Sequence, residues 1–342
     1  MNKAKHKYVI QFQNGLDQPN AVAKAPDDIS YFLEKDGYER IDVATMGEGT
    51  TFFLKYFLVN FLNIVCRVKN HSLVVVQYPV YSKKGSLVWH CVRMALKLKK
   101  KVHFALIIHD LRSLTGEEYS LNKEIMELNS YDYIVAHSKR MVDYLSRNGC
   151  KARCLQLGLF DYSASAAPTR TRTNSTCICF AGNLAKSLFL SHLDQLCVTG
   201  LSFSLYGSPQ YKSSDTISYN GTFCPDAIPD LNGSWGLVWD GPSICELSGR
   251  AGVYQKYNSP HKASLYILAG LPLIVNVESA IAELVRREKL GICIDSLMNL
   301  HATITRITDD EYNEMISNVQ NYSTKLKNGN SIRIALKQIF NG

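Results

Sequence analysis

Short apolar segments alternate with helical segments along the chain, and this alternation restricts the possible folds more than any other feature of the sequence. In the first half, strands are predicted at 7–13, 40–43, 72–78, 101–109, 133–136 and 154–157. Helical patterns lie between them, at 26–35, 50–69, 86–98, 121–128 and 138–147. Short apolar strands separated by helices are typical of a parallel sheet that is covered on both faces. The first half is therefore predicted to be an α/β domain.

A second alternation follows a segment rich in Ser, Thr, Ala and Arg at 163–175, which is the best linker candidate. Its elements are predicted at 176–180, 188–197, 202–206, 235–239, 261–269, 271–275, 280–288 and 291–294. The 342 residues also exceed the roughly 250–300 at which chains usually split into domains. We predict a first Rossmann-like domain at 1–165 and a second at 166–342, whose C-terminal helix could pack back on the first domain.

Two successive doubly wound, Rossmann-like domains resemble the architecture of the two-domain glycosyltransferases called GT-B, in which the domains face a central cleft. Ligands of such sheets bind at the carboxyl ends of the strands, at the switch point of the topology. The residues that follow each strand are therefore the candidates for function.

The net charge of +8 comes from one segment. No acidic residue lies between Glu48 and Asp110, whereas ten Lys and Arg residues do, so the rest of the chain carries 28 basic and 30 acidic residues. Five aromatic residues recur there at helical spacing: Phe52, Phe53, Tyr56, Phe57 and Phe61. Such a segment suits an anionic membrane surface. Alternatively, the aromatic residues are core and the lysines are solvated. Nucleic acid is not an expected partner, because no recognised binding motif accompanies the charge.

Membrane spans and metal sites are not predicted. The most apolar run, 52–65, is interrupted by Lys55 and is shorter than the about 18–20 residues of a span, and the N-terminus lacks a signal core. The ten cysteines show no Cys-x-x-Cys and no zinc spacing. We expect reduced thiols and a cytoplasmic protein, with the inner face of the cell membrane as a candidate location.

Two glycine-containing strand exits in the second half are candidate ligand loops. The first places Gly182, Asn183 and Lys186 between a strand and a helix, where backbone and a cation can approach phosphate. The second, Tyr206-Gly207, could pack a ring against a base or ribose. Both are also compatible with ordinary loops.

The strongest motif starts with the buried strand that ends on Asp240. Pro260 suits the first turn of the following helix, which Asn258 or Ser259 can cap. Three basic side chains gather at this helix start: Lys256, His261 and Lys262. A diphosphate would bind well at such an end. The alternative is that these are capping and surface residues.

In the first half, the strand at 101–109 is followed by Asp110, and His109 precedes it. A titratable pair at a strand's carboxyl end is where a general base would lie, although a salt link or cap is equally compatible. The loop after the first strand contains Asn14 and Asp17, and Asp17 is the reserve candidate for the base.

These motifs together resemble one bacterial sugar-transferase family. The segments that carry the resemblance are Ala181–Ser187, Tyr206-Gly207, Trp235–Gly241 and Lys256–Tyr266, with Lys24–Asp28 and Ile107–Arg112 in the first half. The family includes β-1,6-galactofuranosyltransferases of O-antigen assembly and glucosyltransferases that extend glycans on serine-rich-repeat adhesins. Gln255 departs from it, because leucine is expected there.

The resemblance implies transfer of a hexose, with galactofuranose ahead of glucose, from a UDP-sugar to a hydroxyl of a growing glycan or lipid-linked glycan. It places Gly182, Asn183 and Lys186 near the diphosphate, and Tyr206 near the nucleoside. The remaining donor-binding residues would be Gly207, Asp240, Lys256, Tyr257, Asn258, His261 and Lys262. On the acceptor side they would be Asn14, Lys24 and His109. Because no Asp-x-Asp occurs in the chain, neither a metal nor another cofactor is expected.

Other functions remain compatible with the same residues. An epimerase or a phosphorylase could share the fold, and a non-catalytic subunit of a glycan assembly complex could share the nucleotide-sugar site. The sequence leaves open whether the protein forms a homo-oligomer.

Overall fold

The computed structural model describes residues 4–12, 21–43, 50–80, 83–116, 118–164 and 171–340. The chain divides into two compact units. Unit 1 comprises Met1–Ala136, Val142–Leu157 and Ile332–Gly342, and unit 2 comprises His137–Met141 and Gly158–Ser331. The first long stretch of unit 1 thus ends ahead of the linker predicted at 163–175, and a short C-terminal stretch returns to unit 1.

Unit 1 contains a six-stranded parallel sheet in the order β2-β1-β3-β4-β5-β6. Its strands are β1 (His6–Phe12), β2 (Glu39–Val43), β3 (Ser72–Tyr78), β4 (His103–Ile108), β5 (Tyr133–Ala136) and β6 (Arg153–Gln156). Every residue of β3 is buried, as expected for a central strand covered on both faces. The order reverses between β1 and β3, which makes this pair the switch point of unit 1.

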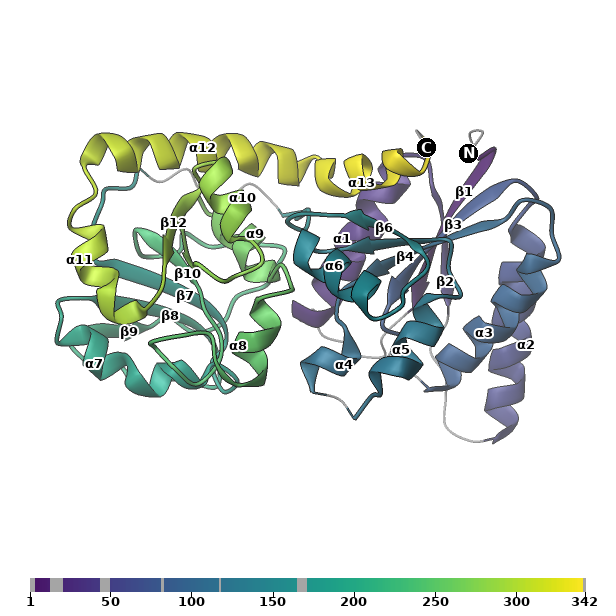
Figure 1. The fold of residues 1–342 in the computed structure, drawn as a ribbon, viewed down its shortest axis with the longest axis horizontal. Coiled ribbons are helices and arrows are strands. Elements are labelled where there is room, and N and C mark those ends of the chain that lie inside the picture. The colour runs from purple at the N-terminus through teal and green to yellow at the C-terminus, as the bar shows by residue number, and fades with distance from the viewer. Residues whose placement is uncertain are drawn as a thin grey trace. The chain divides into compact units, whose positions relative to one another are not determined.

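Helices lie on both faces of this sheet (Figure 1). They are α1 (Ala21–Lys35), α2 (Thr50–Arg67), α3 (Lys83–Lys97), α4 (Arg112–Thr115), α5 (Leu121–Leu128), α6 (Lys139–Arg147) and α13 (Asn330–Phe340). No helix among the described residues is long and apolar enough to cross a membrane.

Unit 2 contains a second six-stranded parallel sheet, in the order β12-β11-β10-β7-β8-β9. Its strands are β7 (Cys177–Asn183), β8 (Ser202–Ser208), β9 (Ile217–Tyr219), β10 (Trp235–Val238), β11 (Leu273–Asn276) and β12 (Gly291–Ile294). Its helices are α7 (Leu193–Cys197), α8 (Gly249–Gln255), α9 (His261–Leu268), α10 (Ala282–Arg287), α11 (Leu300–Ile304) and α12 (Asp309–Lys327). The strand order is that of the Rossmann fold, with its switch point between β7 and β10.

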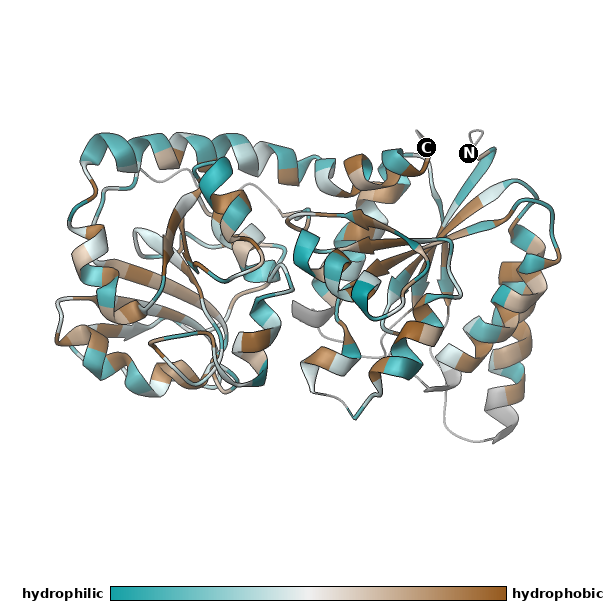
Figure 2. Cartoon of the chain, viewed as in Figure 1, coloured by the Kyte–Doolittle hydropathy of each residue, from teal (hydrophilic) through white to brown (hydrophobic). Residues whose placement is uncertain are grey.

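The prediction of two doubly wound α/β domains is confirmed, and the apolar residues concentrate in the strands of both sheets (Figure 2). Sequence reasoning missed β9 and α8. The helix predicted to begin at 26 begins at Ala21, so Pro26 lies inside α1. Proline normally ends a helix because it lacks an N–H, but here its carbonyl accepts a hydrogen bond from Gln77 of β3, which ties this turn to the sheet.

The end of the predicted linker is fastened to unit 2 by Arg172. This buried side chain donates hydrogen bonds to the carbonyls of Leu231, Gly233 and Ala269, over 2.6–3.0 Å. Residues 165–170 of the linker lie outside the described residues.

Candidate functional site

The switch point of unit 2 places Gly182, at the end of β7, beside Asp240, which follows the neighbouring strand β10. Lys262 of α9 reaches the same place. Its Nζ lies 3.1 and 3.3 Å from the two carboxylate oxygens of Asp240 and 4.5 Å from the ring centroid of Phe180. The structure therefore brings together three of the predicted donor-binding residues.

Gly182 leaves room for one further atom at this point, at van der Waals distance from Lys262 and Phe180. A Cβ on residue 182 would lie 3.7 Å from the Lys262 Nζ, and residue 182 is exposed. A ligand atom can therefore approach the backbone of β7 and the Lys262 ammonium together. The Asp240 carboxylate balances that ammonium, a partner that the sequence analysis did not predict.

Tyr266 fixes α9 against the sheet. Its hydroxyl accepts a hydrogen bond of 2.7 Å from the Ala181 N–H, and its ring is fully buried. The ring lies against Gly236 of β10, where a Cβ would come within 2.4 Å of it. Gly236 and Tyr266 together set the height of Lys262 above the ends of β7 and β10.

Gly207 has a structural role at the end of β8. It has φ +137°, and a Cβ there would lie 1.8 Å from the Gly182 carbonyl oxygen. Only glycine allows the two strand ends to approach so closely. The neighbouring Tyr206 is buried in the core of unit 2, where its hydroxyl accepts from the Asn232 N–H over 2.8 Å. Its contact with a nucleoside remains a prediction.

The loop after β7 is shaped by Asn183, whose Oδ1 accepts from the Lys186 N–H over 3.0 Å. The side-chain oxygen therefore helps to shape this turn, and the hydrogen bond leaves the Nδ2 donor of Asn183 uninvolved. Lys186 itself is exposed and has no carboxylate partner within the described residues.

The segment before α9 is held by contacts to His137 and Ser138, which directly precede α6 and belong to unit 2. Ser138 Oγ donates to the Tyr257 carbonyl over 2.7 Å, and the Ser259 N–H donates to His137 Nδ1 over 3.1 Å. Lys256 forms an ion pair of 2.8 Å with Glu278. Lys256 and Lys262 thus each have a carboxylate partner, and both remain partly exposed.

Helix α9 begins at His261 with Pro260 at the N-cap, and no side chain caps it. The prediction that Asn258 or Ser259 caps this helix is wrong. The extended conformation of Pro260, with ψ 134°, separates both side chains from the first helical turn. No side chain therefore caps the amino end of α9, an end to which the helix dipole attracts an anion.

Three side-chain atoms just before α9 are buried without a hydrogen-bond partner among the described residues: Gln255 Nε2, Asn258 Oδ1 and Ser259 Oγ. Buried polar groups are normally satisfied, so such a group of exceptions calls for an explanation. Gln255 uses its Oε1 to accept from the Asp240 N–H over 3.2 Å. Sequence reasoning did not predict Gln255 as a site residue, and its only signal was the departure from leucine.

His261 faces aromatic residues rather than a phosphate position. Its ring stacks on Tyr162 with centroids 4.7 Å apart, and Phe160 packs edge-on against it at 5.9 Å. The ring thus packs the start of α9, and its contact with a donor remains a prediction.

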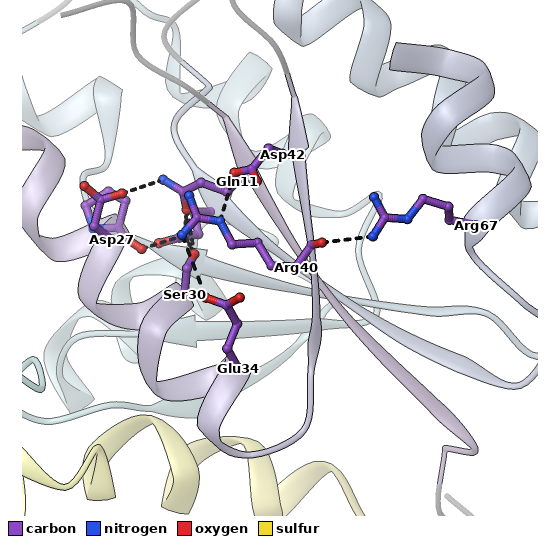
Figure 3. A network of polar contacts seen from close by, with 9 residues as sticks. Gln11, Asp27, Ser30, Glu34, Arg40, Asp42 and Arg67 are labelled. Atoms are coloured by element: carbon purple, nitrogen blue, oxygen red, sulfur yellow. Dashed lines mark hydrogen bonds and ion pairs between the residues drawn. The ribbon is translucent and has the colours of Figure 1, made fainter. Parts of the chain in front are cut away.

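In unit 1, a polar network occupies the switch point between β1 and β3. Gln11 of β1 donates to Asp27 over 3.0 Å and accepts from Ser30 over 2.6 Å (Figure 3). The Gln77 Nε2 of β3 donates to Gln11, Ser30 and the Pro26 carbonyl. Figure 3 also draws ion pairs that join Arg40 of β2 to Glu34 of α1 and to Asp42 of β2.

Gln77 determines the tautomer of His109. The Pro26 carbonyl can only accept, so the Gln77 Nε2 faces Pro26 and its Oε1 faces His109, 2.7 Å from the ring Nε2. The His109 Nε2 therefore carries the hydrogen, and in the neutral ring Nδ1 carries the lone pair. Two glutamines that sequence reasoning missed thus orient a predicted acceptor-side residue.

Asp110 follows β4, and the main chain after it is held by hydrogen bonds to the side chain of Glu124. This buried carboxylate accepts from the Arg112 N–H over 2.7 Å and from the Tyr78 hydroxyl over 2.8 Å. The same carboxylate satisfies the amino end of α4. Glu124 therefore fixes the main chain on the carboxyl side of Asp110.

Lys24 is buried inside α1, where it pairs with Asp28 over 2.5 Å. Predicted to face an acceptor, it instead takes part in a buried ion pair. Asn14 and Asp17 lie outside the described residues. Among the residues that the structure describes, no three His, Cys, Asp or Glu side chains are grouped as metal ligands would be.

Two parallel α/β units, each with polar residues at its switch point, give the chain the GT-B fold. It belongs to the glucosyltransferase 3-like family. The family's N-terminal domain matches residues 7–159 and its C-terminal domain matches residues 178–339. The predicted family resemblance is confirmed.

Curated relatives carry two different activities in their names. The chain is 26% identical to the beta-1,6-galactofuranosyltransferase WbbI of Escherichia coli K12, covering 82% of this chain and 83% of the relative. It is also 26% identical to glucosyltransferase 3 of Streptococcus gordonii, covering 78% of each chain.

Solved structures share the fold at low sequence identity. A glycosyltransferase from Rickettsia africae superposes with a TM-score of 0.58 at 10% identity, covering 98% of both chains. An Escherichia coli structure, described as trehalose-6-phosphate bound with UDP-2-fluoro glucose, has a TM-score of 0.60 at 8% identity, covering 98% of this chain and 99% of that one. These likenesses support the GT-B fold.

Proposed function

We propose that this glycosyltransferase moves a hexosyl group from a UDP-sugar to a hydroxyl of a growing bacterial surface glycan. Galactofuranose is our first candidate for the hexose, and glucose is the second. The observation that carries the proposal is the position of Lys262 beside Gly182, at the switch point of unit 2 and at the uncapped start of α9. Transfer from UDP develops negative charge on the leaving diphosphate. A fixed ammonium and the amino end of a helix stabilise such charge.

The unpartnered polar atoms support the same proposal. The donor's sugar or diphosphate would supply hydrogen-bond partners for Asn258 Oδ1 and Ser259 Oγ, which have none among the described residues. Lys256, beside Glu278, would complete the cation pair around the diphosphate. With these cations in place, and no Asp-x-Asp in the chain, we expect transfer without a metal.

The acceptor would bind at the switch point of unit 1. Asp110 follows β4 and is our candidate for the group that takes the acceptor proton. His109, whose ring is held by Gln77, would orient the acceptor hydroxyl. A glycan or lipid-linked glycan offers such hydroxyls.

Peripheral membrane association is proposed on the basis of α2 and α3. Six of the 14 exposed large apolar side chains in the described residues lie on these two helices, and a seventh, Leu98, directly follows α3. The six are Leu54, Leu58, Val59, Leu62, Leu87 and Met94. The helices carry long apolar stretches in Figure 2, and exposed Lys55 and Lys97 lie among them. Of the predicted aromatic residues, Tyr56, Phe57 and Phe61 are half-buried, and the side chains of Phe52 and Phe53 lie outside what the structure describes. Among the described side chains of α2 and α3, those that are large, apolar and exposed are aliphatic. Exposed apolar surface with cations suits the inner face of a cell membrane.

The decisive experiment measures UDP release by the purified protein from UDP-galactofuranose, UDP-galactose and UDP-glucose, with and without a glycan acceptor. Acceptor-dependent release from one donor is the expected result. Lys262→Ala should abolish it, whereas Lys327→Ala, an exposed lysine on α12, should not. Binding of a UDP-sugar without release under any condition would favour the non-catalytic subunit instead.

A further inference from the structure

A cavity of about 610 Å³, open to solvent on one side, lies at the amino end of β1 and is bordered by residues of β1, the end of α1 and α13. It is lined by Ala4, Lys7, Leu33, Asp36, Tyr38, Arg333, Leu336, Lys337 and Phe340. Its volume is within the usual range for small-ligand sites, roughly 300–1,000 Å³. We call it the Lys7 cavity.

The Lys7 cavity is separate from the candidate acceptor site. In a parallel sheet all strands point the same way, so the amino ends lie at the opposite edge from the carboxyl ends. Lys7 is at the start of β1, whereas Gln11, His109 and Asp110 lie at or beyond the carboxyl ends of their strands. A ligand in this cavity would therefore have a different role from the glycosyl acceptor.

The walls of the cavity are apolar. Leu33 and Leu336 are buried, the Tyr38 ring is 7% exposed, and Phe340 is half-buried. Burial, and next the neighbouring Asp36 carboxylate, raise the pKa of the Tyr38 phenol, so its hydroxyl stays protonated and able to donate. The walls can therefore contact hydrocarbon, with one polar group among them.

The charges in the cavity are unbalanced. Arg333 neutralises Asp36 with a bidentate contact, 2.7–3.0 Å between guanidinium nitrogens and carboxylate oxygens. Lys7 and Lys337 have no carboxylate partner within the described residues. The Lys7 Nζ lies 5.2 Å from the Tyr38 ring centroid and 5.7 Å from that of Phe340. Two positive charges are thus left beside apolar walls.

The surroundings add positive charge. A second hollow of about 230 Å³ shares Lys7 and is lined also by Lys5, His6 and Lys69, while its Glu39 pairs with Arg67 over 2.7 Å. Lys100 and Lys101 are exposed just before β4, at the same amino edge. Helices α2 and α3 end at Arg67 and Lys97, immediately before that edge.

We propose that the Lys7 cavity binds the headgroup of an anionic phospholipid, with the phosphate between Lys7 and Lys337 and the glycerol and first methylenes against Leu33, Tyr38 and Phe340. A free phosphate needs the cations but not the apolar walls, whereas a neutral lipid needs the walls but not the cations. The proposal deepens the peripheral association proposed above, and it is independent of the donor chemistry.

The test uses the full chain and two probes. Dihexanoylphosphatidylglycerol, below its critical micelle concentration, is titrated into the protein by calorimetry. Glycerol 3-phosphate, which has the phosphate but no acyl chains, is titrated in the same way for comparison. Sedimentation then compares vesicles of pure phosphatidylcholine with vesicles containing phosphatidylglycerol. We expect saturable binding of the short-chain lipid, much weaker binding of glycerol 3-phosphate, and preference for the anionic vesicles.

Three variants distinguish lipid binding in the Lys7 cavity from non-specific attraction of the lipid to positive charge on the protein. Lys7→Gln with Lys337→Gln should weaken lipid binding by about tenfold to thirtyfold, as two lost cations imply. Lys212→Gln with Lys327→Gln, which removes two exposed charges from unit 2, should change it little. Ala4→Trp fills the cavity without changing charge and should abolish saturable binding of the short-chain lipid.

Each variant is also tested for UDP binding, which reports folding of the donor site and separates failure of this proposal from failure of the proposed function. Equal binding of the short-chain lipid by wild type and by a folded Lys7→Gln/Lys337→Gln variant would overturn the proposal. So would glycerol 3-phosphate binding as tightly as the lipid, which would indicate a soluble phosphate ligand. Association of the protein with itself, without lipid binding, would also overturn it.

Discussion

Replacing Gly182 with alanine should separate ligand binding from folding. The new Cβ would lie 3.7 and 3.8 Å from Lys262 Nζ and Cε and 3.9 Å from Phe180 Cε1, all ordinary van der Waals distances. Gly182 is not among the glycines with positive φ, so alanine can adopt its backbone conformation. The free energy of unfolding should stay within about 1 kcal/mol of wild type, and reduced freedom of the unfolded chain favours a slight increase.

The same methyl group would occupy the space beside the Lys262 ammonium that we assign to a phosphate oxygen. Loss of one charge-assisted contact costs about 1.5–3 kcal/mol, or roughly a 10- to 150-fold higher Kd for UDP. Calorimetric titration with UDP and a melting curve are measured on the same preparation.

Gly207→Ala is the matched control, because its Cβ would lie 1.8 Å from the Gly182 carbonyl oxygen at φ +137°. It should destabilise the protein by about 3 kcal/mol or more. A folded Gly182→Ala protein that binds UDP as tightly as wild type would refute the placement of the diphosphate beside Gly182.

Four further predictions concern single residues or conditions. Lys256→Ala and Lys262→Ala should each weaken UDP binding by about 1.5–3 kcal/mol in calorimetry, and unchanged affinity in both would contradict the site. Transfer should continue in excess EDTA, and activity that is lost there and restored by Mg²⁺ or Mn²⁺ would show that a metal is required. Asp110→Asn should lower turnover by about 10²–10⁴-fold at unchanged UDP affinity, whereas a lower melting temperature with native turnover would assign Asp110 to the loop alone. Arg172→Ala should cost more than about 3 kcal/mol in thermal unfolding, because it leaves three buried carbonyls without their donor; an unchanged melting temperature would contradict this.

Local sequence was sufficient to predict the sheets and the edge at which the site lies. Strands such as β3 are continuously apolar because helices cover both faces, and this pattern is visible without any long-range information. Parallel strands also place their carboxyl ends at one edge, so Gly182, Asp240 and Asp110 could be identified as candidates from their position after strands.

The structure alone decided how these residues are paired. Lys262 was predicted to be a phosphate ligand, and its contact with Asp240 depends on Tyr266 fitting against Gly236, which sets the height of α9. Gln11 and Gln77 are 66 positions apart, and their contact depends on the register of β1 against β3.

The packing of α13 on unit 1 likewise depends on contacts between residues far apart in the sequence. Arg333 forms its ion pair with Asp36, which is 297 positions away in the sequence. The hydrophobic periodicity of the two segments does not indicate this pairing. The sequence by itself determined most of the strands and helices and the sheet edge at which the candidate residues lie, because these depend on neighbours along the chain. Only the tertiary structure decided which charges are paired, which polar atoms lack partners and where the Lys7 cavity forms, because these depend on packing between segments far apart in sequence.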